Sequence, residues 1–118
     1  SAGQHAAFKQ TPMYLRSAYW IGAPKSGAEQ QFQDLIEREL LPAMRAMPGV
    51  SSVRGLWPVK REDSPPAVAL QVLVAFDSLA DAQRMLECEE RKALRPRVLE
   101  AIALFDGSLS HIEFDIRS

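Results

Sequence analysis

The sequence predicts an α+β domain in which one antiparallel sheet carries its helices on one face. Three observations support this. The 118 residues are 47% hydrophobic and 25% charged, which suits a single globular core. Apolar residues recur at helical spacing in 28–47 and again after residue 78. Four other stretches are rich in branched and aromatic residues or alternate in polarity, as strands do.

The first half is predicted to contain a strand, a helix and a second strand. Residues 13–21 are rich in aromatic and branched side chains, and the Gly/Pro-containing segment 22–27 ends that strand. Residues 28–47 form an amphipathic helix, in which Pro42 predicts a kink or an end to regular hydrogen bonding. Residues 51–58 follow as the second strand.

The second half begins with a polar, proline-containing loop at 60–66. Residues 67–76 form the strongest strand, and both of its faces are mostly apolar. Ser78–Asp81 resembles a capping box and opens the second helix, which Pro96 is expected to interrupt and restart. Residues 109–116 form the last strand. The order β-α-β-β-α-β is the ferredoxin-like pattern, a four-stranded antiparallel sheet with both helices on one face.

Composition argues against several classes of partner. The net charge is −1 and basic residues are interspersed with acidic ones, so we expect no nucleic-acid surface. One cysteine, Cys88, cannot form an internal disulfide, and we expect a cytoplasmic protein. With only two histidines, neither a metal site nor a cofactor is predicted. The apolar runs are too short for a membrane span. We expect a flexible arm at 1–12, containing His5, and one domain at 13–118.

The apolar character of both sheet faces predicts a homodimer, or a higher oligomer. Helices cover only one face, and in a monomer the other face would meet water. Neither side of the first strand and neither side of 67–76 is properly hydrophilic. Because an exposed apolar patch usually marks an interface, we expect two copies to pack sheet against sheet and close an α/β barrel.

A resemblance to a known family follows from this order of elements. Pro48-Gly49 after the first helix, the interrupted helix SLADAQRMLECEERKALRPRVLEAIALFDG and the strand HIEFDI resemble EthD-like proteins of the dimeric α/β-barrel superfamily. The group is named for ethyl tert-butyl ether degradation. The resemblance implies a homodimer with one cavity per protomer. Relatives include cofactor-free monooxygenases, isomerases and dehydratases of small, often aromatic molecules, and others bind haem. A histidine on a helix or loop, as haem-binding relatives have, is missing here.

The candidate site follows from how the strands are oriented. If Ile112, Phe114 and Ile116 face the helices, the ionisable residues between them face the barrel side. In the first strand, either face could pack against the helices, and the two choices are nearly equal. We assign Leu15, Tyr19 and Ile21 to the helices. The residues then predicted to line the cavity are Arg16, Trp20, Gln71, His111 and Glu113.

These residues suggest proton-transfer chemistry. A histidine beside the carboxylate of Glu113 is a candidate general base, because the anion raises its proton affinity. Arg16 could orient a carboxylate or enolate, Trp20 could stack on a ring, and Gln71 adds a polar contact. The alternative is an Arg16–Glu113 ion pair with His111 as a solvated residue of an edge strand.

Three functions remain open on this evidence. The protein could bind a small hydrophobic or aromatic metabolite and perform cofactor-free catabolic chemistry with His111. It could instead be a non-enzymatic accessory or binding protein of a degradation pathway. Finally, it could be an interaction protein whose cavity is filled by its own side chains.

Overall fold

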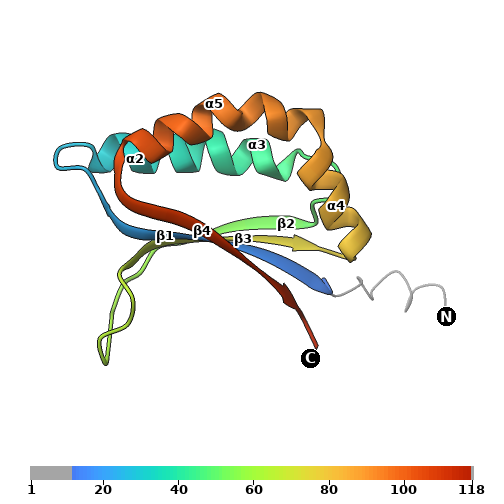
Figure 1. The fold of residues 1–118 in the computed structure, drawn as a ribbon, viewed down its shortest axis with the longest axis horizontal. Coiled ribbons are helices and arrows are strands. Elements are labelled where there is room, and N and C mark those ends of the chain that lie inside the picture. Colours follow the sequence, from blue (N-terminus) through green and yellow to red (C-terminus); the bar gives the residue numbers. More distant parts are fainter. Residues whose placement is uncertain (1–11, 118) are drawn as a thin grey trace, which may run out of the picture.

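A computed structural model describes residues 12–117, so His5 and nearly all of the predicted arm lie outside the described residues. The four strands form one antiparallel sheet in the order β2-β3-β1-β4, and the helices lie on one face of it (Figure 1). The elements are β1 (Tyr14–Pro24), α2 (Glu29–Leu35), the π-helical turn η1 (Ile36–Leu40), α3 (Leu41–Arg45), β2 (Ser52–Leu56), β3 (Val68–Phe76), α4 (Leu79–Glu87), α5 (Glu89–Ala103) and β4 (Phe105–Asp115). The ferredoxin-like α+β fold is confirmed.

The first helical segment is irregular just before its proline, as predicted. Pro42 has no N–H group and cannot donate to the carbonyl of residue 38. The preceding turn widens, and the N–H of Leu41 bonds to the carbonyl of Ile36, five residues back. This wider turn lets Leu40 and Leu41, which are neighbours in the chain, both be buried on the sheet side. The irregular turn therefore adds an apolar side chain to the wall above the sheet.

The break in the second helical segment lies at Cys88, and its prediction at Pro96 was wrong. Ser78 caps α4 as predicted, accepting a bond from the N–H of Asp81 at 3.1 Å. At Cys88 the backbone is extended, and its Sγ accepts a bond from the N–H of Arg91 at 3.3 Å, which starts α5. Pro96 lies inside α5. The turn at 88 separates α4, at the end of the sheet, from α5, which runs above it (Figure 1).

Three aromatic rings anchor the helices on the sheet. Trp20 of β1, Phe32 of α2 and Phe105 of β4 are buried, and their ring centroids lie 5.1–5.3 Å apart. The two contacts of Trp20 are edge-to-face, and aromatic pairs at these distances add stabilisation beyond the burial of apolar area. Since the three residues come from separate elements, the cluster fixes the distance between α2 and the β1–β4 edge. Within residues 12–117, none of the helices is both long and apolar enough to span a membrane.

The tight contact between Gly49 and α4 can be tested with two glycines. Gly49 and Gly27 both have positive φ, +86° and +84°. A Cβ at Gly49 would overlap the carbonyl oxygen of Asp81 in the first turn of α4, whereas Gly27 has open space around it. Alanine adds a backbone cost of about 1–2 kcal/mol at either position. We expect Gly49→Ala to lower the free energy of unfolding in urea clearly more than Gly27→Ala. Equal losses would contradict the close approach.

Candidate functional site

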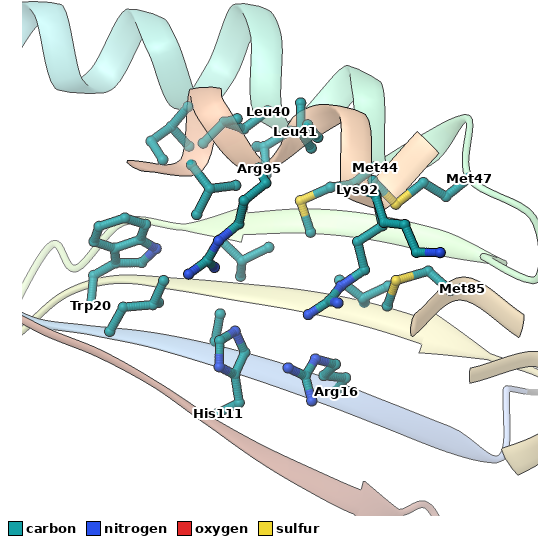
Figure 2. Close-up of a pocket in the computed structure, with 18 residues that line it drawn as sticks. Arg16, Trp20, Leu40, Leu41, Met44, Met47, Met85, Lys92, Arg95 and His111 are labelled. Atoms are coloured by element: carbon teal, nitrogen blue, oxygen red, sulfur yellow. The ribbon is translucent and has the colours of Figure 1, made fainter. Parts of the chain in front are cut away.

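A cavity of about 410 Å³ lies between the helices and the sheet (Figure 2). Its buried end is apolar, and its exposed residues come from α5 and β4, so the mouth lies between these two elements. The chain's own side chains leave this space open. The residues that line it are Arg16, Ala18, Trp20, Ile36, Leu40, Leu41, Met44, Met47, Val72, Val74, Met85, Arg91, Lys92, Leu94, Arg95, Val98, Leu109 and His111.

The cavity is on the helix-covered face, and this corrects the predicted orientation of two strands. Trp20 packs against Phe32 of α2, so the even-numbered residues of β1 face the helices. Arg16 lies opposite Glu113, and Ala18 lies opposite His111, in the register of β1 and β4. Residues directly opposite on neighbouring strands share a face. The ionisable side of β4 therefore also faces the helices.

The residues expected to face the helices lie on the uncovered side instead. Ile112 and Phe114 of β4 are 51% and 38% exposed, which excludes a place in the helix-covered core. Leu15 and Tyr19 of β1 lie on this same side, by strand alternation from Trp20. The prediction failed because both faces of these strands mix apolar and polar side chains. Packing against α2 decides the orientation.

Gln71 is separated from the other predicted site residues. It lies opposite Tyr19, on the uncovered face. Its Nε2 donates to the hydroxyl of Ser17 at 2.9 Å. Ser17 is fully buried in the middle of the sheet. Gln71 therefore satisfies a buried hydroxyl, and it does not line the cavity.

Glu113 is held as the partner of two other side chains. Arg16 Nη1 donates to its Oε2 at 2.7 Å, and the Tyr14 hydroxyl donates to its Oε1 at 2.5 Å. The Tyr14 bond is the main cause that lowers the pKa of Glu113, with a further contribution from Arg16, while desolvation opposes both. The same bond raises the pKa of Tyr14. The alternative ion pair between Arg16 and Glu113 is thus present, and a carboxylate held this way is a poor general base.

His111 lies at the mouth of the cavity, beside Arg16 on the sheet (Figure 2). Desolvation is the main cause that lowers the pKa of His111, and the charges of Arg16 and Arg91 lower it further. Glu113 acts in the opposite direction, and its effect is the smallest. The expectation that the carboxylate dominates and raises the proton affinity of His111 was wrong. Instead, the lowered pKa favours the neutral imidazole near pH 7, in which one ring nitrogen can accept a proton.

Three cations of α5 at the mouth were missed in the sequence. Arg91, Lys92 and Arg95 line the cavity, and Figure 2 shows Arg95 reaching from α5 toward the sheet. The available signal was the spacing of Arg91 and Arg95 with the cavity-lining Leu94 and Val98, which puts all four on one helix face. The misplaced break at Pro96 concealed this face. Among residues 12–117, no three side chains of His, Cys, Asp or Glu gather in a way that could hold a metal ion.

The fold is that of a group of small ferredoxin-like proteins. No protein-family model and no curated protein matches the chain. Among solved structures, an EthD family protein from Bacillus halodurans is 17% identical, with a TM-score of 0.70, over 89% of this chain and 99% of the other. The EthD-like resemblance is thereby confirmed at the level of the fold.

Two further structures show the same fold with different descriptions. SnoaB from Streptomyces nogalater, a cofactor-independent oxygenase in a mutant form, is 15% identical over 90% of this chain and 93% of its own, with a TM-score of 0.60. A dimeric ferredoxin-like protein of unknown function from Thermobifida fusca is 14% identical over 92% and 96%, with a TM-score of 0.61. At such identities the likeness concerns the fold.

The neutral state of His111 can be tested by NMR titration. The chain has two histidines, so His5→Gln leaves one imidazole signal. We expect its midpoint below the ordinary value of about 6.5. Adding Arg91→Gln should raise the midpoint, because a nearby cation disfavours the imidazolium. Arg97→Gln, on the same helix but paired with Glu39 and Glu100, serves as the control. A midpoint at or above the ordinary value would refute the assignment.

Proposed function

We propose that this protein binds a small apolar or aromatic metabolite in the cavity between its helices and its sheet. The observation that carries the proposal is an open, mostly apolar space whose polar groups gather at its mouth, on both α5 and the sheet. Ligand sites are typically concave and apolar, with a few polar groups that orient the ligand. Trp20 and Met44 offer an aromatic edge and an adaptable thioether to such a ligand.

Within that cavity, we assign His111 the role of general base. A neutral imidazole at the edge of an apolar space can take a proton from a weakly acidic C–H or O–H group of the ligand. The proton moves to the imidazole, which becomes an imidazolium, and the ligand becomes a carbanion, an enolate or another oxyanion, with which monooxygenase, isomerase or dehydratase chemistry without a cofactor can begin. The description of SnoaB as a cofactor-independent oxygenase supports this class of chemistry. Arg16 remains the candidate that orients a ligand oxygen, with Glu113 as its positioning partner.

The second candidate function is non-enzymatic binding, as in an accessory protein of a degradation pathway. It is favoured by the exposure of His111 at the mouth, where water competes with the ligand for the accepting ring nitrogen. Both functions require an occupied cavity, and they differ only in whether His111 changes the ligand.

One probe tests cavity and base together. 5-Nitrobenzisoxazole is a neutral bicyclic aromatic whose ring opens when a base removes its C–H proton, giving a coloured phenolate. We expect a saturable rate with the wild type. His111→Gln should lower kcat by about 10²-fold, at the low end for a positioned general base, with KM nearly unchanged. Leu109→Trp fills the cavity and should abolish saturation, whereas Leu99→Trp, exposed on α5, is the matched control.

The outcomes separate the two functions. Binding seen by calorimetry without turnover would support the accessory role and remove His111 as a base. Absence of binding would refute the proposed cavity function. Full turnover in His111→Gln would show that another group takes the proton.

We further propose that a second copy of the chain covers the bare face of the sheet. Leu56, Ile112 and Phe114 are exposed there by 38–51%, on strands at both edges of the sheet. The helices lie on the opposite face, and within residues 12–117 Figure 1 shows no helix or strand over this one, only the loop between β2 and β3 extending on its side. A two-fold pairing of sheets would bury these apolar side chains. The dimeric description of the Thermobifida fusca neighbour supports this arrangement.

Oligomeric state tests this face with a matched pair of substitutions. Ile112→Lys puts a charge into the proposed interface, and Ile102→Lys puts one on the exposed side of α5. Burying an isoleucine contributes about 1.5–3 kcal/mol. The dimer dissociation constant should therefore rise at least about tenfold in the first variant, measured by sedimentation equilibrium, and stay unchanged in the second. A monomeric wild type at high concentration would exclude the dimer.

A further inference from the structure

The polar lining of the cavity has one sign of charge. Five lining residues carry ionisable nitrogen groups: Arg16, Arg91, Lys92, Arg95 and His111. Among residues 12–117, no aspartate or glutamate lines the cavity, although the whole chain has 15 acidic and 14 basic residues. Because near-neutral composition would supply both signs by chance, this one-sided lining indicates a site selective for negative charge.

Two of these cations already have a carboxylate partner. Arg16 is paired with Glu113 at 2.7 Å, and Lys92 with Glu89 at 3.1 Å. Their charges are therefore largely compensated within the protein. They contribute less to an incoming anion than an uncompensated cation does.

Arg91 and Arg95 are the uncompensated pair. Within residues 12–117, neither makes an ion pair, and Arg91 Nη1 donates only to the carbonyl of Leu86 at 3.3 Å. Arg97, two residues further along α5, shows the contrast, because it contacts both Glu39 and Glu100. Of the three arginines of α5, Arg97 therefore pairs with carboxylates, whereas Arg91 and Arg95 line the cavity and have no carboxylate partner in the described part of the chain. Figure 2 shows the side chain of Arg95 extending from α5 toward the sheet.

The spacing of the pair suits a single anionic group. Residues four apart on a helix are neighbours on one face, so Arg91 and Arg95 repel one another while both remain unpaired. A carboxylate or an enolate-type oxygen between them would relieve that repulsion and accept planar, charge-assisted hydrogen bonds. Below them, the cavity continues into apolar walls formed by residues such as Met44 and Val72. One end of the space therefore suits an anion and the other an apolar body.

We infer that the ligand of this cavity is an organic anion, with a carboxylate or enolate-type group bound by Arg91 and Arg95 and an aromatic or aliphatic body in the apolar interior. This inference rests on the proposed function, since it names the chemical class of the ligand for the same cavity. It adds that two arginines of α5 recognise the negative charge of the ligand, in addition to Arg16 of the sheet. His111 then lies on the opposite wall, close to the charged end of the ligand.

A matched pair of probes tests the charge preference. 2-Naphthoate and 2-naphthamide have the same ring system and similar shape, and only the first is an anion. Calorimetry should show naphthoate binding the wild type about tenfold more tightly than naphthamide, with a preference that weakens as salt increases. Arg91→Gln/Arg95→Gln should remove the preference by weakening the binding of naphthoate much more than that of naphthamide. Arg97→Gln, with its melting temperature checked, should retain it.

Each outcome decides between the two proposals. Equal affinities of the two probes in the wild type would overturn the anion assignment and leave the cavity function standing. A preference that survives in Arg91→Gln/Arg95→Gln would likewise overturn the assignment of these arginines. Failure of both probes to bind the wild type would overturn the cavity function together with the inference built on it.

Discussion

The packing of Trp20 determines the arrangement of the candidate site. Its indole is held at its edges by Phe32 of α2 and Phe105 of β4. Burial of a large aromatic ring is worth several kcal/mol, more than any orientation preference of the polar residues on the same strand. Once Trp20 faces the helices, strand alternation places Arg16 on the same side. The antiparallel register with β4 then places His111 and Glu113 there as well.

The cavity exists because a small side chain in the sheet lies opposite irregular turns in the helical layer. In the sheet, Ala18 lies between Val72 and His111 and leaves space where a larger side chain would fill it. On the helical side, the π turn before Pro42 and the extended backbone at Cys88 keep the helices from packing as two regular rods. Irregular helical turns of this kind are frequent at functional sites. Here they shape an apolar wall without leaving a buried side-chain polar atom unpaired in the described residues.

The sequence was sufficient for the fold and insufficient for the site. Strong local signals predicted the element order correctly, including the Ser78 cap and the irregularity before Pro42. Which face of β1 and β4 meets the helices could not be predicted, because both faces carry apolar residues and only tertiary packing distinguishes them. The break at Cys88 was also missed, since an extended residue capping a helix through its sulfur has no strong local signature. That error concealed Arg91 and Arg95.

The two errors had opposite consequences for the chemistry. The first error left Arg16, Trp20, His111 and Glu113 grouped together. Every second residue of a strand lies on the same face, so assigning both strands the wrong face moved all four residues to the other side of the sheet together. Only Gln71 was misgrouped, because it lies opposite Tyr19 on the uncovered face while the other four residues lie on the helix-covered face. The missed helix face, by contrast, changed the electrostatics. The sequence predicted only the anion of Glu113 beside His111, whereas the cations of β1 and α5 have the larger effect on its pKa.

This sign matters for how a base in such a cavity would work. A histidine beside a dominant carboxylate is protonated more readily and is therefore less available as a base at low pH. Desolvation, together with the charges of Arg16 and Arg91, lowers the pKa of His111 and favours its neutral form. The same cations would stabilise an anion formed when His111 removes a proton from the ligand. An organic anion bound by Arg91 and Arg95 would in turn offset part of their effect on the imidazole. Ligand charge and proton affinity would then be coupled across the cavity, from α5 to β4.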